Sequence, residues 1–355
     1  MKKLLMTAAA AALALGAASA SGTAANVKAC WVYVGPIGDF GWSYQHHQGL
    51  LAVQKEFGDK VETAFAENIP EADSDKTIER FARDGCNIIF TTSFGYMEPT
   101  LKVAAKFPDV KFEHATGYKN ADNVTTYNAK FHEGRYVIGQ IAAKMSKTGV
   151  AGYIVSFPIP EVVAGINAFM LGAQSVNPDF KIKVIWANTW FDPAKEADAA
   201  KVLLSQGADI MVQHTDSTAP LQIAQEQGKF GFGQSSDMMA FAPKAQLTAI
   251  VDSWGPYYVK RVKAAIDGTW ASTQSWEGMA EGAVTMAPYA NMPDDVAKMA
   301  AETQAAITAG TLNPFTGPIT KQDGTVVGEA GKPLPDGDIL GMNWYVKGVD
   351  DKLPQ

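Results

Sequence analysis

The sequence predicts an α/β protein built from two doubly wound lobes that are joined by hinge strands. Short apolar β-forming runs alternate with helical segments along most of the 355 residues, which is typical of parallel sheets with right-handed crossovers. The alternation comes in two rounds, and the second begins near Phe131. The length is sufficient for two domains, and no Pro/Ser/Gly-rich linker separates the rounds. The connections between the lobes are therefore expected to be short and strand-like.

The first unit of this pattern is the stretch from Trp31 to Gln48. Its apolar start, including Val32 and Val34, predicts a buried strand. A glycine-rich loop follows, and Ser43 is expected to cap a helix over 44–57. In an open α/β sheet, ligands bind beyond the carboxyl ends of the strands. The loop that carries Asp39, Phe40 and Trp42 lies at such an end.

The remaining elements follow in the same order. Further strands are expected over 61–66, 87–92, 111–115, 124–128, 151–156, 182–187, 210–213, 230–233 and 247–251. Helices are expected over 74–84, 97–107, 133–145, 161–176, 194–206, 221–227 and 257–267. The last stretch, 310–355, is rich in Gly, Pro and Asp, and is expected to wrap one lobe with turns and short strands.

The first twenty residues have the features of a secretory signal peptide. Lys2 and Lys3 form a basic start, Leu4–Leu15 form a short apolar run, and Ala18-Ser19-Ala20 fits the cleavage pattern. The alternative is a membrane anchor, but the run falls short of the ~20 apolar residues that span a bilayer. No Cys follows the cleavage site, so lipidation is not expected. The mature protein is predicted to be periplasmic.

The net charge of the mature chain argues against two classes of binding partner. Loss of Lys2 and Lys3 leaves 28 basic against 37 acidic residues, a net charge of −9. An acidic chain is a poor binder of nucleic acid or of an anionic membrane surface. Neither partner is therefore expected.

The sequence contains two cysteines, Cys30 and Cys86. Cys30 begins the first expected strand, and Cys86 lies just before the third. In a doubly wound sheet of strand order 2-1-3 these two strands are neighbours, so a disulfide is possible in an oxidising compartment. Two small buried apolar side chains would give the same pattern. The sequence leaves both alternatives open.

Aromatic and acidic residues gather at the predicted strand ends. Trp42, Trp190 and Trp254 stand in polar loops, although packing alone would also explain any single one of them. Several Trp residues on one face suggest a cleft that sandwiches a flat or ring-shaped ligand. Carboxylates and amides accompany them and basic residues are scarce, so the ligand should carry N–H or O–H donors and no strong negative charge. The candidate ligand-binding residues are Asp39, Phe40, Trp42, Tyr96, Asn128, Phe157, Trp190, Phe191, Asp216, Asp237 and Trp254.

Catalytic and metal signals are weak. The sequence contains no G-x-S-x-G, no H-E-x-x-H and no phosphate-binding glycine loop. His46 and His47 are adjacent and therefore point in different directions on a helix. No catalytic residue, metal or cofactor is predicted, and the expected role is binding.

Several motifs together resemble the basic-membrane-protein family of ABC-transporter solute receptors, which includes purine nucleoside receptors. These motifs are Gly38-Asp39-Phe40-Gly41-Trp42-Ser43, Phe131-His132-Glu133-Gly134-Arg135-Tyr136, Phe157-Pro158-Ile159-Pro160-Glu161-Val162, Trp190-Phe191-Asp192-Pro193 and Gln213-His214-Thr215-Asp216-Ser217-Thr218. The resemblance covers nearly all of the mature chain. It implies a type I periplasmic-binding-protein fold, with lobes over 27–129 plus 253–280 and over 130–252 plus 281–355.

The resemblance also implies a monomeric receptor that closes on a purine and delivers it to a membrane permease. Trp42 matches the aromatic of the first lobe, and Trp190 or Phe191 that of the second. Polar contacts are expected from Asp39, Asn128, Asp216 and Asp237.

Relatives that bind nucleosides hold the ribose with a Lys, whereas the corresponding stretch 252–258 has no basic residue. Trp254 is expected to fill the ribose volume, which favours a base such as adenine. A sugar receptor and an exported nucleoside hydrolase are the alternatives.

Overall fold

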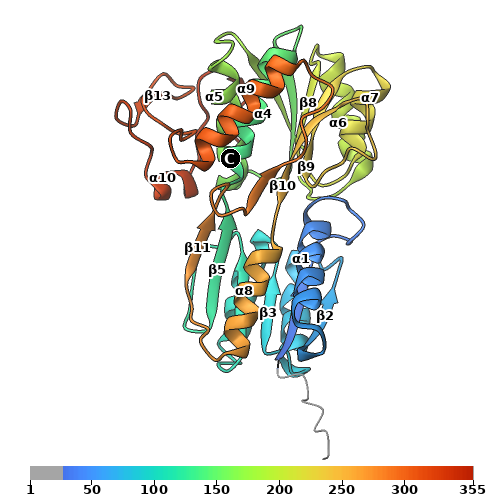
Figure 1. The fold of residues 1–355 in the computed structure, drawn as a ribbon, viewed down its shortest axis with the longest axis vertical. Coiled ribbons are helices and arrows are strands. Elements are labelled where there is room, and N and C mark those ends of the chain that lie inside the picture. The colour runs from blue at the N-terminus through green and yellow to red at the C-terminus, as the bar shows by residue number, and fades with distance from the viewer. Residues whose placement is uncertain (1–26, 355) are drawn as a thin grey trace, which may run out of the picture.

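The computed structural model describes Val27–Pro354, so the expected signal peptide over 1–20 lies outside the described residues. Two sheets, each flanked by helices, lie one above the other along the long axis of the molecule (Figure 1). We call the parts built on them the first and the second lobe. The predicted two-lobed α/β architecture is confirmed.

The first lobe contains a six-stranded sheet of order β11-β5-β4-β3-β1-β2, in which each neighbouring pair is parallel. Its strands are β1 (Val27–Val32), β2 (Val61–Ala66), β3 (Ile88–Thr91), β4 (Lys111–Ala115), β5 (Val124–Ala129) and β11 (Gln274–Glu277). The helices are α1 (Trp42–Phe57), α2 (Ser74–Arg83), α3 (Met97–Ala104) and α8 (Gly255–Ile266). The central strands β1 and β3 are almost entirely buried, as apolar runs in a parallel sheet require.

The second lobe contains a seven-stranded sheet of order β12-β10-β9-β8-β6-β7-β15, in which only the pair β10–β12 is antiparallel. Its strands are β6 (Val150–Val155), β7 (Lys181–Trp186), β8 (Ile210–His214), β9 (Phe230–Ser235), β10 (Gln246–Asp252), β12 (Val284–Met286) and β15 (Val349–Asp350). The helices are α4 (Phe131–Met145), α5 (Pro160–Gln174), α6 (Pro193–Ser205), α7 (Ala219–Glu226), α9 (Asp294–Thr308) and α10 (Asp336–Leu340). The short hairpin β13 (Ile319–Thr320) and β14 (Val326–Val327) lies in the C-terminal segment beside this lobe (Figure 1).

The chain passes between the lobes three times. It leaves the first sheet after β5 and enters α4, returns from β10 into α8, and leaves again between β11 and β12. Each passage takes only a few residues, and Asp252 at the end of β10 is fully buried. The lobes are therefore joined by three short connections rather than by a linker.

Some boundaries differ from the sequence-based expectation. Ser43 was expected to cap the first helix, but it lies inside α1, where its Oγ accepts a hydrogen bond from the Gly35 N–H. The N-cap position is Gly41, and the Asp39 carboxylate caps the helix from two residues earlier, because it accepts hydrogen bonds from the backbone N–H groups of Gly41, Ser43 and Tyr44 at 2.8–2.9 Å. An acidic side chain at a helix N-terminus is favoured by the helix dipole. The helix α9 was not predicted at all.

Cys30 and Cys86 form a disulfide with a Cα–Cα separation of 6.0 Å. The predicted neighbouring positions of β1 and β3 are confirmed, and this proximity explains the bond. Both residues are buried against the apolar face that α2 and α3 cover. Of the two alternatives that the sequence left open, the structure therefore selects the disulfide.

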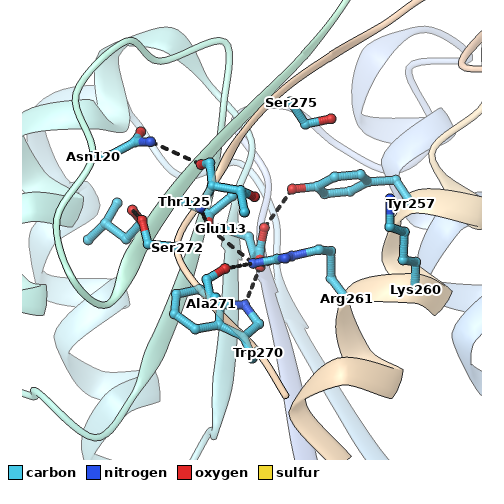
Figure 2. A network of polar contacts seen from close by, with 12 residues as sticks. Glu113, Asn120, Thr125, Tyr257, Lys260, Arg261, Trp270, Ala271, Ser272 and Ser275 are labelled. Carbon is cyan, nitrogen blue, oxygen red and sulfur yellow. Dashed lines mark hydrogen bonds and ion pairs between the residues drawn. The ribbon is translucent and has the colours of Figure 1, made fainter. Parts of the chain in front are cut away.

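A buried polar network fastens α8 to the first sheet (Figure 2). The Arg261 Nε lies 2.5 Å from Oε1 of Glu113 on β4, and the Tyr257 hydroxyl and the Trp270 indole N–H donate to the same carboxylate. Arg261 also donates to the Thr125 hydroxyl at 3.0 Å. Burial raises the pKa of Glu113, although Arg261 and the hydrogen bonds oppose this. Each buried charge thus has its partner.

Candidate ligand-binding site

The two lobes touch where the loop after β8 meets the start of α1. The Trp42 backbone N–H donates to Oδ1 of Asp216 at 3.2 Å. A Cβ atom added at Gly41 would lie only 2.7 Å from the Asp216 Cβ, so a side chain there would push the lobes apart. The rings of Phe40 and Phe241, which come from opposite lobes, lie 4.5 Å apart. The structure thus has the lobes in contact.

A small cavity lies behind this contact, with a volume of about 30 Å³. Both lobes line it, through Val34, Trp42, Ser93, Phe94 and Thr116 on one side and Ile159, Glu161, Trp190, His214, Asp216 and Gln234 on the other. We call it the tryptophan cavity. It has room for only one or two waters, so a ring-shaped ligand would need the lobes to move apart.

Trp42 is held in a fixed orientation at this cavity. Its indole N–H donates to the Thr92 carbonyl at 2.6 Å. The edges of His46 and Trp254 meet the ring at centroid distances of 4.3 and 5.5 Å. His46 is itself fixed by a hydrogen bond of 2.5 Å to the Tyr258 hydroxyl. These contacts fix the orientation of the Trp42 ring at the cavity wall.

Trp190 lines the cavity from the second lobe, in the loop after β7. Its ring packs on Phe157 at 5.0 Å, and its backbone carbonyl accepts from the Asp216 N–H at 3.0 Å. The indole N–H is buried and has no hydrogen-bond partner among residues 27–354. A buried Trp usually satisfies this donor, so an acceptor on a ligand would suit the site.

Acidic and amide side chains complete the wall. Burial raises the pKa of Asp216, and the nearby carboxylates of Asp39 and Glu196 raise it further. A carboxyl group with a raised pKa can offer an O–H donor as well as an acceptor. Glu161 lies 3.5 Å from the His214 ring, and its other oxygen has no partner within the described chain. The side-chain amide oxygen of Gln234 accepts a hydrogen bond from the guanidinium group of Arg135.

A second, larger cavity of about 380 Å³ lies next to the first. Phe94, Thr116, Ile159 and Glu161 line both cavities, so the two meet at these residues. We call the larger one the lateral chamber. Its other walls come from β5, β11, the N-terminal turns of α4 and α5, the loop at 117–118, and α10. Among the described residues, neither cavity is lined by Lys or Arg.

The predicted site residues divide into two groups. Trp42, Trp190 and Asp216 line the tryptophan cavity, and Asn128 lines the lateral chamber. The sequence therefore identified both aromatic walls and one acid that meets them.

The other candidates line neither cavity. Asp39 is occupied as the cap of α1, and Asp237 is exposed and accepts from Met239 and Gln246. Phe40 is 39% exposed and packs on Phe241 at the lobe contact. A left-handed backbone (φ 58°) at Phe40 turns the chain there.

Three of the aromatic candidates pack against other side chains, and the fourth lines neither cavity. Tyr96 is fully buried in the first lobe, where its hydroxyl donates to the Ile69 carbonyl. Trp254 is buried against His46, with the rings stacked at 4.6 Å, so it does not fill a ribose volume at the cavity. Phe157 supports Trp190 from behind, and the half-buried Phe191 is not part of either wall.

Several lining residues were missed. His214 ends β8 and Gln234 lies near the end of β9, so their place at the carboxyl edge of the sheet was a usable signal. Glu161 belongs to the motif 157–162 and lies one residue inside α5. Phe94 begins a short 3-10 turn three residues after the end of β3.

Comparison with known proteins identifies the family. Residues 26–312 match the family described as ABC transporter substrate-binding protein, PnrA-like, also called Bmp. The chain belongs to this family. A purine-binding protein of Brucella abortus is 65% identical over 331 residues, which cover 93% of this chain and 95% of that protein. A Haloferax volcanii protein assigned as an ABC-transporter glucose-binding protein is 34% identical, covering 93% and 82%.

A solved solute-binding protein of an ABC transporter from Aeropyrum pernix shares the fold of this PnrA-like protein. Its TM-score is 0.72 at 17% identity, with 81% of this chain and 92% of that chain covered. The predicted periplasmic-binding-protein fold is thus confirmed.

Membership of the PnrA-like family gives the protein a role as a binding receptor and not as an enzyme. Receptors of this class work outside the cytoplasm, where they capture a small molecule for a membrane permease. Within residues 27–354, no helix has the length and apolar character that crossing a bilayer requires.

Proposed function

We propose that this receptor binds a purine base between Trp42 and Trp190. The observation that carries the proposal is that each lobe contributes one Trp to the same cavity. Base–aromatic stacking tolerates any flat heterocycle, and one indole from each lobe at the same cavity suits a ligand that is enclosed when the lobes close. The Brucella abortus relative that is 65% identical is a purine-binding protein, which supports the same class of ligand.

Polar contacts in this proposal come from Asp216, Glu161 and Gln234. Carboxylate and amide oxygens accept hydrogen bonds from ring N–H and exocyclic amine groups. A phosphate or carboxylate ligand would call for Arg or Lys, and neither lines the cavities in the described part of the chain. The ligand therefore carries no strong negative charge.

We expect the base adenine to bind at least about tenfold more tightly than adenosine. Ribose hydroxyls that lose water without gaining a partner cost roughly 1–3 kcal/mol per group, and the chamber beside the site is mainly apolar. Competition calorimetry with adenine, guanine, hypoxanthine and their nucleosides measures the preference. Equal or tighter binding of the nucleosides would reject it.

A sugar is the second candidate, because one relative is assigned as a glucose-binding protein. Sugars also stack on Trp and donate to carboxylates. Glucose included in the same titrations separates the two classes, since the proposal expects no heat from glucose at concentrations that saturate the site with adenine.

We expect ligand to close the lobes about the three connections. The tryptophan cavity cannot hold a base while the lobes touch as they do here. The free receptor must therefore open to admit a base, and the liganded form must keep the lobes slightly further apart than in this structure. Saturating adenine should reduce the radius of gyration in X-ray scattering and raise the melting temperature. Trp42→Ala at the same adenine concentration is the control. Unchanged scattering for the wild type would contradict the expectation.

The maturation of the receptor is part of the proposal. Cleavage after Ala20 would release an unlipidated monomer into the periplasm. Intact-mass measurement of the exported protein tests this, because a retained leader or an added lipid would change the mass.

A further inference from the structure

The lateral chamber is the larger of the two cavities and is not needed for stacking a base between the Trp residues. Its volume of about 380 Å³ lies within the range of small-molecule sites, about 300–1,000 Å³. It shares four lining residues with the tryptophan cavity, two from each lobe, so the two cavities lie side by side, and a ligand that holds the lobes apart can extend from one into the other. Glu161 stands at this junction with a buried, unpartnered oxygen.

The walls of the chamber are mainly apolar. Phe131, Trp276 and Ile159 contribute, and among the described residues the only acidic group is Glu161 at the junction. Asn128 is half-buried, and its side-chain oxygen already accepts from the Ala129 N–H. Thr116, His132 and Gln274 also line the chamber, but most of the wall is apolar, so an alkyl or aryl group would gain from burial there.

The lateral chamber is open to solvent at one end even though the lobes are in contact at Trp42 and Asp216. Tyr118 of the first lobe is 62% exposed and Leu340 of the second is 38% exposed, and both line the chamber. A group that is longer than the chamber can therefore reach solvent between them.

The wall that α10 provides is held firmly. The Asn167 amide on α5 donates to the Trp344 carbonyl at 2.7 Å and accepts from the Val346 N–H at 2.9 Å. These bonds fix the segment after α10, which lies beyond the part of the chain matched by the family, residues 26–312. The C-terminal segment therefore shapes one side of the chamber.

We propose that the lateral chamber is a second subsite, which takes an uncharged apolar substituent carried by the purine. The preferred ligands are then purine bases with an alkyl or aryl group on a ring or exocyclic nitrogen. This inference rests on the proposed purine function and specifies its substrate class.

Calorimetry with adenine, N6-benzyladenine and 9-benzyladenine tests the subsite. The two isomers point the same group in different directions, so at least one should reach the chamber. Burial of the phenyl ring should make that isomer bind about tenfold more tightly than adenine, or better. The subsite is rejected if adenine binds and both isomers bind more weakly than adenine. Absence of adenine binding would reject the purine function itself.

Two substitutions test whether the benzyl group of the ligand lies in the lateral chamber. Ala164 on α5 is buried and lines the chamber only, so Ala164→Leu narrows it. This change should weaken the preferred benzyl isomer at least tenfold more than adenine. Ala301→Leu, on the exposed face of α9, adds the same group elsewhere and is the matched control.

A second variant covers the case in which Ala164→Leu disturbs folding. Leu340→Ala removes a partly exposed side chain from the open end of the lateral chamber, and should weaken the benzyl isomer severalfold more than adenine. Equal effects on adenine and on the benzyl isomer, in every variant that folds, would overturn the proposal.

Discussion

Replacing Trp42 with alanine should weaken adenine binding by about tenfold to a hundredfold. Stacking of a base on an aromatic ring is worth roughly 1–3 kcal/mol, and this ring is already held by Thr92 and His46. Titration calorimetry measures the change. Trp42→Phe keeps a stacking face and should recover most of the affinity.

Trp344→Ala serves as the matched control, because this Trp lies in the C-terminal segment and lines neither the tryptophan cavity nor the lateral chamber. It should leave the affinity for adenine unchanged. Wild-type affinity in Trp42→Ala would put the binding site elsewhere.

The largest loss of stability is expected from Glu113→Gln. This change leaves the Arg261 charge buried beneath α8 without its counter-charge, and breaking a buried ion pair costs about 3–5 kcal/mol. Chemical denaturation followed by circular dichroism measures the free energy of unfolding. A midpoint equal to that of the wild type would show that the pair contributes no net stability.

Two further variants isolate the pair. Glu98→Gln removes a carboxylate whose ion pair with Lys119 is exposed, and the midpoint should not move. The double variant Glu113→Gln/Arg261→Met removes both charges, and should recover part of the loss because no buried charge is left unpaired.

The order of the first three strands and the two-lobed plan were predictable because short apolar β-forming runs alternate with helical segments. Apolar runs such as Ile88–Thr91 have no other stable place than a buried parallel strand. The helix α9 was missed although the sequence carries its signals: acidic residues Asp294 and Asp295 follow Pro293, the stretch is Ala-rich, and the buried positions Val296, Ala300, Thr303 and Ile307 have helical spacing.

The site was predictable at its tryptophans but not at its acids. Asp39 and Asp216 both stand after strands in polar loops, and the sequence treats them alike. The backbone turn at Phe40 brings three amide N–H groups to the Asp39 carboxylate, so Asp39 caps the helix α1. Asp216 instead accepts a hydrogen bond from the Trp42 N–H of the other lobe. Trp254 was misjudged for a similar reason, since the apolar helices around it bury it. These outcomes depend on how distant segments meet.

The three connections between the lobes also decide how the protein responds to cutting. Neither sheet is built from one continuous fragment, because β11 and α8 return to the first lobe only after the second has begun. A single proteolytic nick at one connection would leave the halves tethered by the other two. Expression of residues 27–129 alone would lack α8 and β11, and would leave Glu113 without Arg261 and β5 as an unpaired edge of the sheet. Half-receptors and simple truncations are thus poor tools for this protein, whereas a nicked chain should still close on its ligand.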